Sequence, residues 1–191
     1  MNPLDLPAGM LWTFFGVLGL FVGSFLNVAI HRHPLEGQSV SHPRRSRCPN
    51  CARELTWKEN VPVVSWAIQR GRCRGCGWRI PVRYPLVELL TAALWLWIAV
   101  ETLGTRPAGG AYLPSDWGLL AVRLLVVSGL VVATFVDFDC FEIPDEVSIG
   151  GMVAAPILTL LVPRLHEGNW LALWAGGGEL DRVSALVDCL A

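Results

Sequence analysis

Charge is scarce in this sequence. Only 16% of the 191 residues are Asp, Glu, Lys or Arg, whereas 53% are hydrophobic, and the mean hydropathy is +0.47. An ordinary soluble domain carries about 25% charged residues, because its surface must face water. The composition therefore excludes an ordinary soluble domain and indicates an integral membrane protein.

No Lys or Arg precedes Arg32, and Asp5 is the only acid before it. The uncharged stretch 6–30 is long enough, at about 1.5 Å per residue, to cross a hydrocarbon core of about 30 Å. A cleaved signal peptide would begin with basic residues, which are missing here. The pattern therefore predicts a first transmembrane span in residues 1–30.

Three later apolar runs are shorter than the first. They cover residues 89–100 with a lead-in from Pro85, 117–136, and 147–163. We predict that each forms a tilted transmembrane helix. A last run, beginning near Trp170, is broken by charges, and we count no span there. The predicted fold class is an α-helical integral membrane protein with about four transmembrane helices.

The basic residues are unevenly distributed. Eleven of the 15 Lys and Arg residues lie between Arg32 and Arg83, against three acids. Loops rich in Lys and Arg stay cytoplasmic, so the N-terminus is predicted to lie on the outer side of the membrane. The predicted organisation is a span in 1–30, a cytoplasmic segment in 31–84 and a transmembrane helical region in 85–191. Counting the spans places residues 137–146 inside.

The cytoplasmic segment contains four of the six cysteines as two C-x2-C pairs separated by 21 residues: Cys48, Cys51, Cys73 and Cys76. This spacing is typical of a tetrahedral zinc site, and four sulfur ligands leave no open position for water. We predict a small zinc-ribbon-like insertion with a structural zinc. The alternatives are two disulfides or free thiols. A reducing compartment disfavours the disulfides.

Arginines and tryptophans near these cysteines raise the question of nucleic-acid binding. No recognition helix or base-stacking platform is visible in the segment. Arginines beside a membrane attract anionic head groups, and tryptophans favour the interface. We therefore predict contact with membrane lipid and not with nucleic acid. Because four cysteines complete the site, His31, His33 and His42 are expected to be interface or loop residues.

Several segments, in order from residue 23 to residue 148, resemble the type IV prepilin peptidases, which are membrane aspartyl peptidases of the GxGD type. They read GSFLNVAIHR (23–32), ENVPVVSWAIQRGRCRGC (59–76), RYPLVELLTA (83–92) and VDFDCFEIPDEVS (136–148), together with the CPNC and CRGC pairs. The resemblance implies cleavage of a short basic leader from prepilin or pseudopilin precursors at the cytoplasmic face. For many members it also implies N-methylation of the new N-terminus with S-adenosylmethionine, an activity associated with the metal-binding segment. The choice between pilus assembly and type II secretion stays open.

The resemblance assigns a catalytic role to Asp137, which opens the D-x-D…PD stretch. An aspartyl peptidase needs one ionised and one protonated carboxylate, because two like charges held close cannot both ionise. On a helix, Asp137 and Asp139 would point about 200° apart, and Pro144 breaks any regular path to Asp145. The second carboxylate must therefore come from another segment.

In the family the second aspartate belongs to a Gly-x-Gly-Asp motif, which this sequence lacks. The nearest string is GGGELD at 176–181, where Glu179 and Asp181 are variant candidates. We interpret this string as a glycine-rich connection, either on the outer side or in a partly inserted segment. We expect the chain to be the N-terminal part of a longer peptidase that supplies the missing motif.

Two other functions stay open. One is a non-catalytic membrane protein whose zinc module docks a cytoplasmic partner. The other is a methyltransferase-only remnant, although no glycine-rich nucleotide fingerprint marks an independent S-adenosylmethionine domain. Glu88 and Arg123 are costly in lipid, so each is expected near an interface or against protein, and a pair between them is left open.

Overall fold

The computed structural model describes residues 8–33, 46–104, 114–141, 144–162 and 165. Within these residues there are four longer helices, together with the 3-10 helix η1 and the short helix α2. Their bounds are α1 Ala8–Arg32, η1 Trp57–Glu59, α2 Val64–Ile68, α3 Arg83–Gly104, α4 Pro114–Cys140 and α5 Asp145–Leu161. The described residues form no strand beyond isolated bridges, so the predicted helical fold class is confirmed.

Helices α1, α3 and α4 are long and apolar enough to cross a membrane. They contain 25, 22 and 27 residues, and so each rises about 33 Å or more. Helix α5 has 17 residues with Pro156 inside it, at the short limit of about 17 residues for a span. Three of the four predicted spans are thus long helices, and the fourth is a shorter one. The doubtful run near Trp170 lies outside the described residues.

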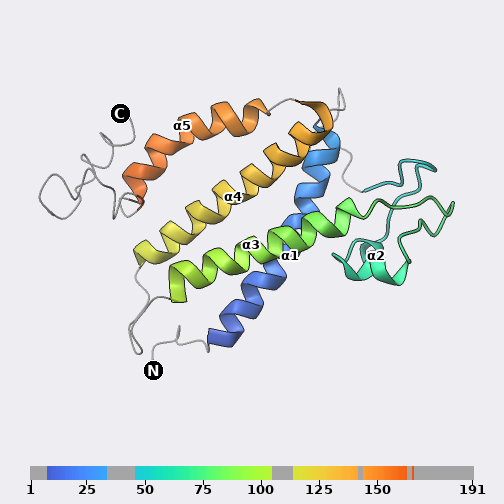
Figure 1. Ribbon diagram of the computed structural model, residues 1–191, viewed down its shortest axis with the longest axis horizontal. Helices are drawn as coiled ribbons and strands as arrows, with labels where there is room; N and C mark the ends of the chain where they lie inside the picture. Colours follow the sequence, from blue (N-terminus) through green and yellow to red (C-terminus); the bar gives the residue numbers. More distant parts are fainter. Residues whose placement is uncertain (1–7, 34–45, 105–113, 142–143, 163–164, 166–191) are drawn as a thin grey trace, which may run out of the picture.

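Helices α1 and α3 approach each other closely where α1 presents glycines (Figure 1). A Cβ atom built on Gly19 would lie 2.7 Å from the Cα of Ala92, and one on Gly23 would lie 2.7 Å from the Cα of Glu88. Residues four apart share one face of a helix, and small residues there let two backbones meet. These two glycines therefore fix the separation of α1 and α3.

Two clusters of buried apolar side chains join α1, α3 and α4. The first consists of Leu11, Phe15, Ala99, Leu103, Leu120 and Leu124. The second lies toward the other end of the same helices and consists of Leu26, Ile30, Val87, Val131 and Val136. Large apolar side chains such as Phe14, Phe21 and Phe25 remain exposed, as expected of helices whose outer surface faces lipid.

Polar side chains within the helices have local partners. The indole nitrogen of Trp95 donates to the Ser128 hydroxyl at 3.1 Å, which ties α3 to α4. Arg123 donates to the Thr102 hydroxyl at 3.0 Å near the end of α3. Glu88 lies in the second turn of α3, about 21 Å away along the helix axis. The Glu88–Arg123 pair left open from the sequence is therefore not formed.

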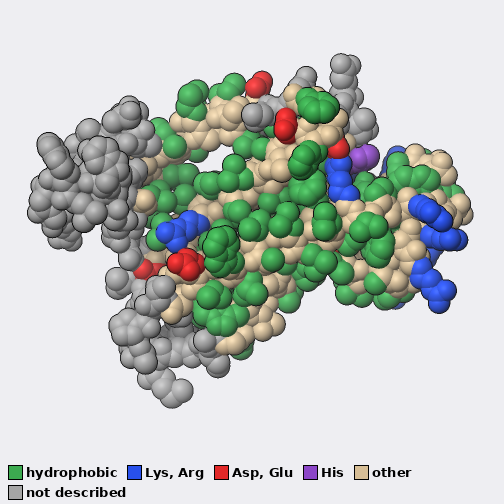
Figure 2. Space-filling model, viewed as in Figure 1, with side chains coloured by type: hydrophobic (Ala, Val, Ile, Leu, Met, Phe, Trp, Pro, Cys, Tyr) green, Lys and Arg blue, Asp and Glu red, His purple; other side chains and the backbone are tan. Residues whose placement is uncertain are grey.

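The cysteine segment projects from one end of the helices (Figure 1). The C-termini of α1 and α4 and the N-terminus of α3 meet at this end. Figure 2 shows basic side chains gathered over the segment, whereas the helices are largely covered by hydrophobic ones. The cysteine segment and the acidic end of α4 thus lie at the same end of the protein, as the predicted topology requires.

The contact at Gly23 can be tested by adding one methyl group. Gly23→Ala places a Cβ against the α3 backbone, so we expect a loss of about 1–3 kcal/mol from overpacking. Gly16→Ala is the matched control on the same helix, because nothing lies within 4 Å of its Cβ. The measurement is thermal unfolding of both variants in detergent. Equal unfolding temperatures for the two variants would contradict the close approach.

Candidate functional site

The two C-x2-C pairs form two similar knuckles. In the first, the Cys48 N–H donates to the Arg53 carbonyl at 3.0 Å, and the Ala52 N–H donates back to the Cys48 carbonyl at 2.9 Å. In the second, the Cys73 N–H donates to the Trp78 carbonyl at 2.8 Å, and the Gly77 N–H donates to the Cys73 carbonyl at 2.9 Å. Both knuckles turn through a left-handed residue four positions after the first cysteine.

The knuckles bring the predicted sulfur ligands together. The four Sγ atoms lie within 4.8 Å of one another, and those of Cys48 and Cys76 are 3.8 Å apart. A tetrahedral zinc with bonds of about 2.3 Å would separate its sulfurs by about 3.8 Å. A disulfide needs about 2.05 Å, and all four cysteines are free. The described histidines His31 and His33 are not part of the cluster.

The four thiols are electrostatically unequal. Backbone N–H groups of Cys76 and Gly75 lower the pKa of Cys73 to about 6. The Asn50 amide and the Trp78 N–H lower the pKa of Cys76. At Cys51 the Arg53 N–H acts in the lowering direction, but desolvation and the three other thiols outweigh it and raise the pKa to about 11. Cys73 therefore ionises more readily than Cys51, and ionising all four thiols together would need a nearby cation, as a metal centre would supply.

An ion pair between Arg53 and Glu59 lies against the second knuckle. Arg53 donates to Glu59 at 2.5 Å, and Glu59 also accepts from the backbone N–H and hydroxyl of Thr56, both at 2.9 Å. A Cβ atom on Gly75 would lie 3.1 Å from Nε of Arg53. Gly75 is therefore needed for this close contact, and Gly77 for the left-handed turn. The spacing T-x-x-E is a capping-box signal that sequence reasoning overlooked.

A second carboxylate holds the cysteine segment against the helices. Val63 has φ 59° and ψ −50°, a conformation that a β-branched residue rarely adopts. Its N–H donates to Oε2 of Glu88 at 2.6 Å, and the Ser24 hydroxyl donates to the same carboxylate. The amide of Asn27 donates to the Tyr84 carbonyl at 3.0 Å. Helices α1 and α3 thus fix a strained turn of the segment.

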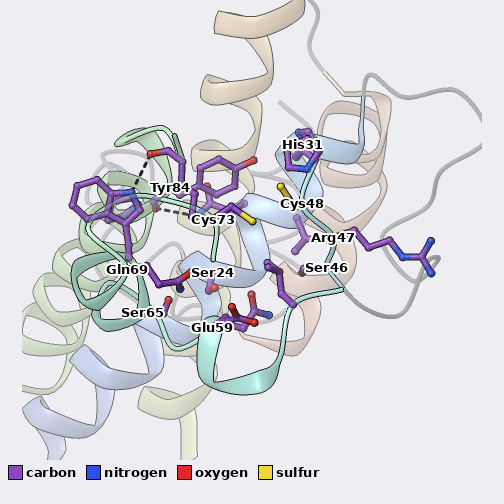
Figure 3. A pocket seen from close by; sticks show the side chains of 18 of the residues that line it. Ser24, His31, Ser46, Arg47, Cys48, Glu59, Ser65, Gln69, Cys73 and Tyr84 are labelled. Atoms are coloured by element: carbon purple, nitrogen blue, oxygen red, sulfur yellow. Dashed lines mark hydrogen bonds between the residues drawn. The ribbon is translucent and has the colours of Figure 1, made fainter. Parts of the chain in front are cut away.

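A cavity of about 560 Å³ lies between these helices and the cysteine segment (Figure 3). Ser24, Asn27 and Glu88 line it from the helices, and the segment contributes polar side chains and the sulfurs of Cys48 and Cys73. Trp66, Trp78 and Tyr84 supply aromatic surface. The mixture of aromatic faces and convergent polar groups is typical of a pocket for a small organic ligand.

The predicted catalytic residue, Asp137, lies in the last turn of α4 and is exposed. Its neighbour Asp139 is paired with Arg83, at 2.5 Å. The helix ends at Cys140, and the next residue, Phe141, has a φ of 56° and donates its N–H to the Asp137 carbonyl at 2.8 Å. The alternative candidates Glu179 and Asp181 lie outside the described residues, so Asp137 is placed without a partner carboxylate from that string.

Comparison with known proteins identifies relatives of this arrangement. Residues 17–102 match the family model described as "Bacterial Peptidase A24 N-terminal domain". The chain is 48% identical over 141 residues to a "Prepilin leader peptidase/N-methyltransferase" of Myxococcus xanthus, an alignment that covers 74% of this chain and 38% of that protein. It is 38% identical over 205 residues to a protein of the same name from Aeromonas hydrophila, covering 90% and 67%.

A third relative is the "Type 4 prepilin-like proteins leader peptide-processing enzyme" of Escherichia coli, 34% identical over 158 residues, covering 72% of this chain and 54% of that protein. No solved structure matches the chain. The alignments thus span between 38% and 67% of the length of these three relatives.

The contribution of Glu59 to the cysteine cluster can be tested by Glu59→Gln. The backbone N–H of Thr56, followed by Arg53, lowers the pKa of Glu59 to about 2, below the ordinary value of about 4.3. Its stabilising contribution is therefore complete above pH 4.3 and is lost as the pH falls toward 2. We expect Glu59→Gln to weaken metal binding about 10- to 100-fold at pH 7. The same factor is expected at pH 6, once the protonation of the thiols is corrected for, because Glu59 is ionised at both pH values.

The matched control is Glu54→Gln, which removes an exposed pair with Arg47 within the same segment. Such exposed pairs contribute little, so this variant should bind metal almost as the parent does. Competition with a chromophoric chelator measures both affinities. Indistinguishable affinities for the two variants would show that Glu59 does not support the cluster.

Proposed function

The chain belongs to the type IV prepilin peptidase family, and we propose that it serves in cleaving the leader from prepilin-like precursors at the cytoplasmic face of the bacterial inner membrane. The N-terminus then lies outside, and the cysteine segment and the end of α4 lie inside. The concentration of basic side chains over the cysteine segment supports this orientation.

The position of Asp137 is the observation that carries the proposal. It is an exposed acid at the end of a long apolar helix, at the same end of the protein as the arginine-rich segment. A precursor anchored in the membrane would present its cleavage site near this end of α4.

In the proposed reaction the Asp137 carboxylate takes a proton from the attacking water. A second, protonated carboxylate would polarise the scissile carbonyl and then stabilise the developing oxyanion. Asp139 is unsuited to that role, because its carboxylate is engaged by Arg83 and lies about 200° around the helix axis from Asp137. The second carboxylate would therefore come from a Gly-x-Gly-Asp segment, which this sequence does not contain.

The test uses the chain fused to a Gly-x-Gly-Asp segment taken from a member of the family, and a precursor with a short basic leader. We expect cleavage by the fusion, none by the 191-residue chain alone, and a loss of about 10³-fold or more in the fusion carrying Asp137→Asn. Asp145→Asn, an exposed acid in the first turn of α5, is the control and should retain activity. Cleavage that survives Asp137→Asn would refute the assignment.

We also propose that the four cysteines hold one structural zinc. All four ligands are thiolates, so the bound ion would neutralise their charge and lock the two knuckles together. Purified chain should contain about one zinc, and Cys73→Ser should lose most of it and loosen the segment. Cys140→Ser, outside the cluster, should keep the metal. Elemental analysis that finds no zinc in protein made with zinc under reducing conditions would contradict this.

A second activity, N-methylation of the cleaved N-terminus, is supported by the cavity beside the cysteines. The names of the Myxococcus and Aeromonas relatives include N-methyltransferase. A cavity of about 560 Å³ with aromatic and acidic walls is large enough for S-adenosylmethionine, and its sulfonium cation suits such walls.

Equilibrium dialysis with labelled S-adenosylmethionine tests this assignment. Trp78→Ala removes one aromatic wall of the cavity and should weaken binding about tenfold, with zinc content unchanged. Trp97→Ala, exposed on the surface of α3, is the matched control and should bind as the parent does. Equal binding by both variants, or none by the parent, would remove the cavity from consideration as the methyl-donor site.

A further inference from the structure

Arg83 stands at the junction between the cysteine segment and the helices. It is the first residue of α3, three residues after Ile80, whose N–H donates to the Gly71 carbonyl at 2.8 Å. The bridge between Arg72 and Arg79 closes the second knuckle immediately before this point. The position of Arg83 is therefore determined by the folded cysteine segment on one side and by α3 on the other.

The Arg83 side chain reaches across to α4 and makes two contacts there. Its Nη1 lies 2.5 Å from Oδ1 of Asp139, and its guanidinium carbon lies 5.8 Å from the centre of the Phe135 ring. The pairs Arg47–Glu54 and Arg53–Glu59 both lie within the cysteine segment. The pair made by Arg83 instead connects the end of that segment to the helix that carries Asp137.

These two contacts fix the rotation of the last turn of α4. Phe135 and Asp139 are four residues apart, so they lie on one face of the helix. Asp137 is two residues from each, about 200° around the helix axis, and therefore points to the opposite face. By holding Phe135 and Asp139 against α3, Arg83 directs Asp137 outward, in agreement with its exposure.

The last turn of α4 also needs an external cation. The C-terminus of a helix carries a partial negative charge, so acids there are unfavourable. This turn contains Asp137 and Asp139 and no basic residue of its own. Arg83 supplies the missing positive charge from α3. Because both partners are about one-third exposed, the pair adds little to global stability, and its main effect is local order.

We propose that Arg83 is a positioning residue for Asp137, and that through it the folded state of the cysteine segment controls the geometry of leader cleavage. The inference rests on the proposed peptidase function for its effect on catalysis. The effect on the last turn of α4 follows from the contacts alone and can be measured separately.

The kinetic test uses the same fusion and precursor as the cleavage assay above. Arg83→Ala should lower kcat about 10- to 100-fold with KM nearly unchanged, because a small displacement of a catalytic group has a cost of this size. Arg83→Lys should recover part of the loss, and the charge exchange Arg83→Asp with Asp139→Arg should recover at least tenfold over Arg83→Ala. Arg79→Ala, an exposed arginine of the same segment, should behave as the parent.

A second measurement does not depend on cleavage. Cys140 is partly buried in the turn that Arg83 holds, so its reaction with a small maleimide should accelerate about tenfold in Arg83→Ala and return toward the parent rate in the charge exchange. Zinc content and the unfolding temperature should not change. This readout still decides the positioning role if the fusion proves unable to cleave any precursor.

Three results would overturn the proposal. The first is a kcat for Arg83→Ala within twofold of the parent in a fusion that Asp137→Asn inactivates. The second is a Cys140 reaction rate that Arg83→Ala leaves unchanged. The third is a parallel loss of zinc, unfolding temperature and kcat, which would show a general structural role. Failure of the parent fusion to cleave, with accelerated Cys140 reaction in Arg83→Ala, would count against the proposed function and leave the positioning role supported.

Discussion

The close contact between α1 and α3 is the constraint on which the other features depend. Gly23 lets the backbone of α3 approach at the level of Glu88, and this brings the Ser24 hydroxyl to the Glu88 carboxylate. The same carboxylate then accepts from Val63 and holds the positive-φ turn of the cysteine segment. A bulkier side chain at Gly23 would therefore disturb more than helix packing, because it would move the acceptor that docks the segment.

The cysteine segment connects α1 to α3 and is held against both helices. The hydrogen bonds Val63–Glu88 and Asn27–Tyr84 fix the segment to α1 and α3, and its last residues lead directly into Arg83. A zinc ion held by all four sulfurs, as proposed, would have no coordination position open to water, so its contribution would be structural. The folded segment lines the cavity beside Cys48 and Cys73, and it contacts the last turn of α4 through Arg83.

Sequence reasoning was most effective where the pattern is local. The spacing of Cys48, Cys51, Cys73 and Cys76 predicted one cluster, and the Sγ atoms do converge. The helical separation of Asp137 and Asp139 was also predictable, since it follows from the residues per turn. The length of α5 was predictable as well, since the apolar run 147–163 and the helix Asp145–Leu161 both span 17 residues. Contacts between distant residues were not predictable: Arg83 and Asp139 are 56 positions apart, and Glu88 bonds to Val63 instead of Arg123.

The proposed topology places the cysteine segment and Asp137 together on the cytoplasmic side of the membrane. Labelling with a membrane-impermeant maleimide tests this placement, in a chain carrying Cys189→Ser so that Cys140 reports on the end of α4. In intact cells, Cys140 and an introduced Lys58→Cys should both be protected and should react only after permeabilisation, whereas Gly110→Cys should react at once. Labelling of Cys140 and of position 58 from opposite sides of the membrane would contradict the account.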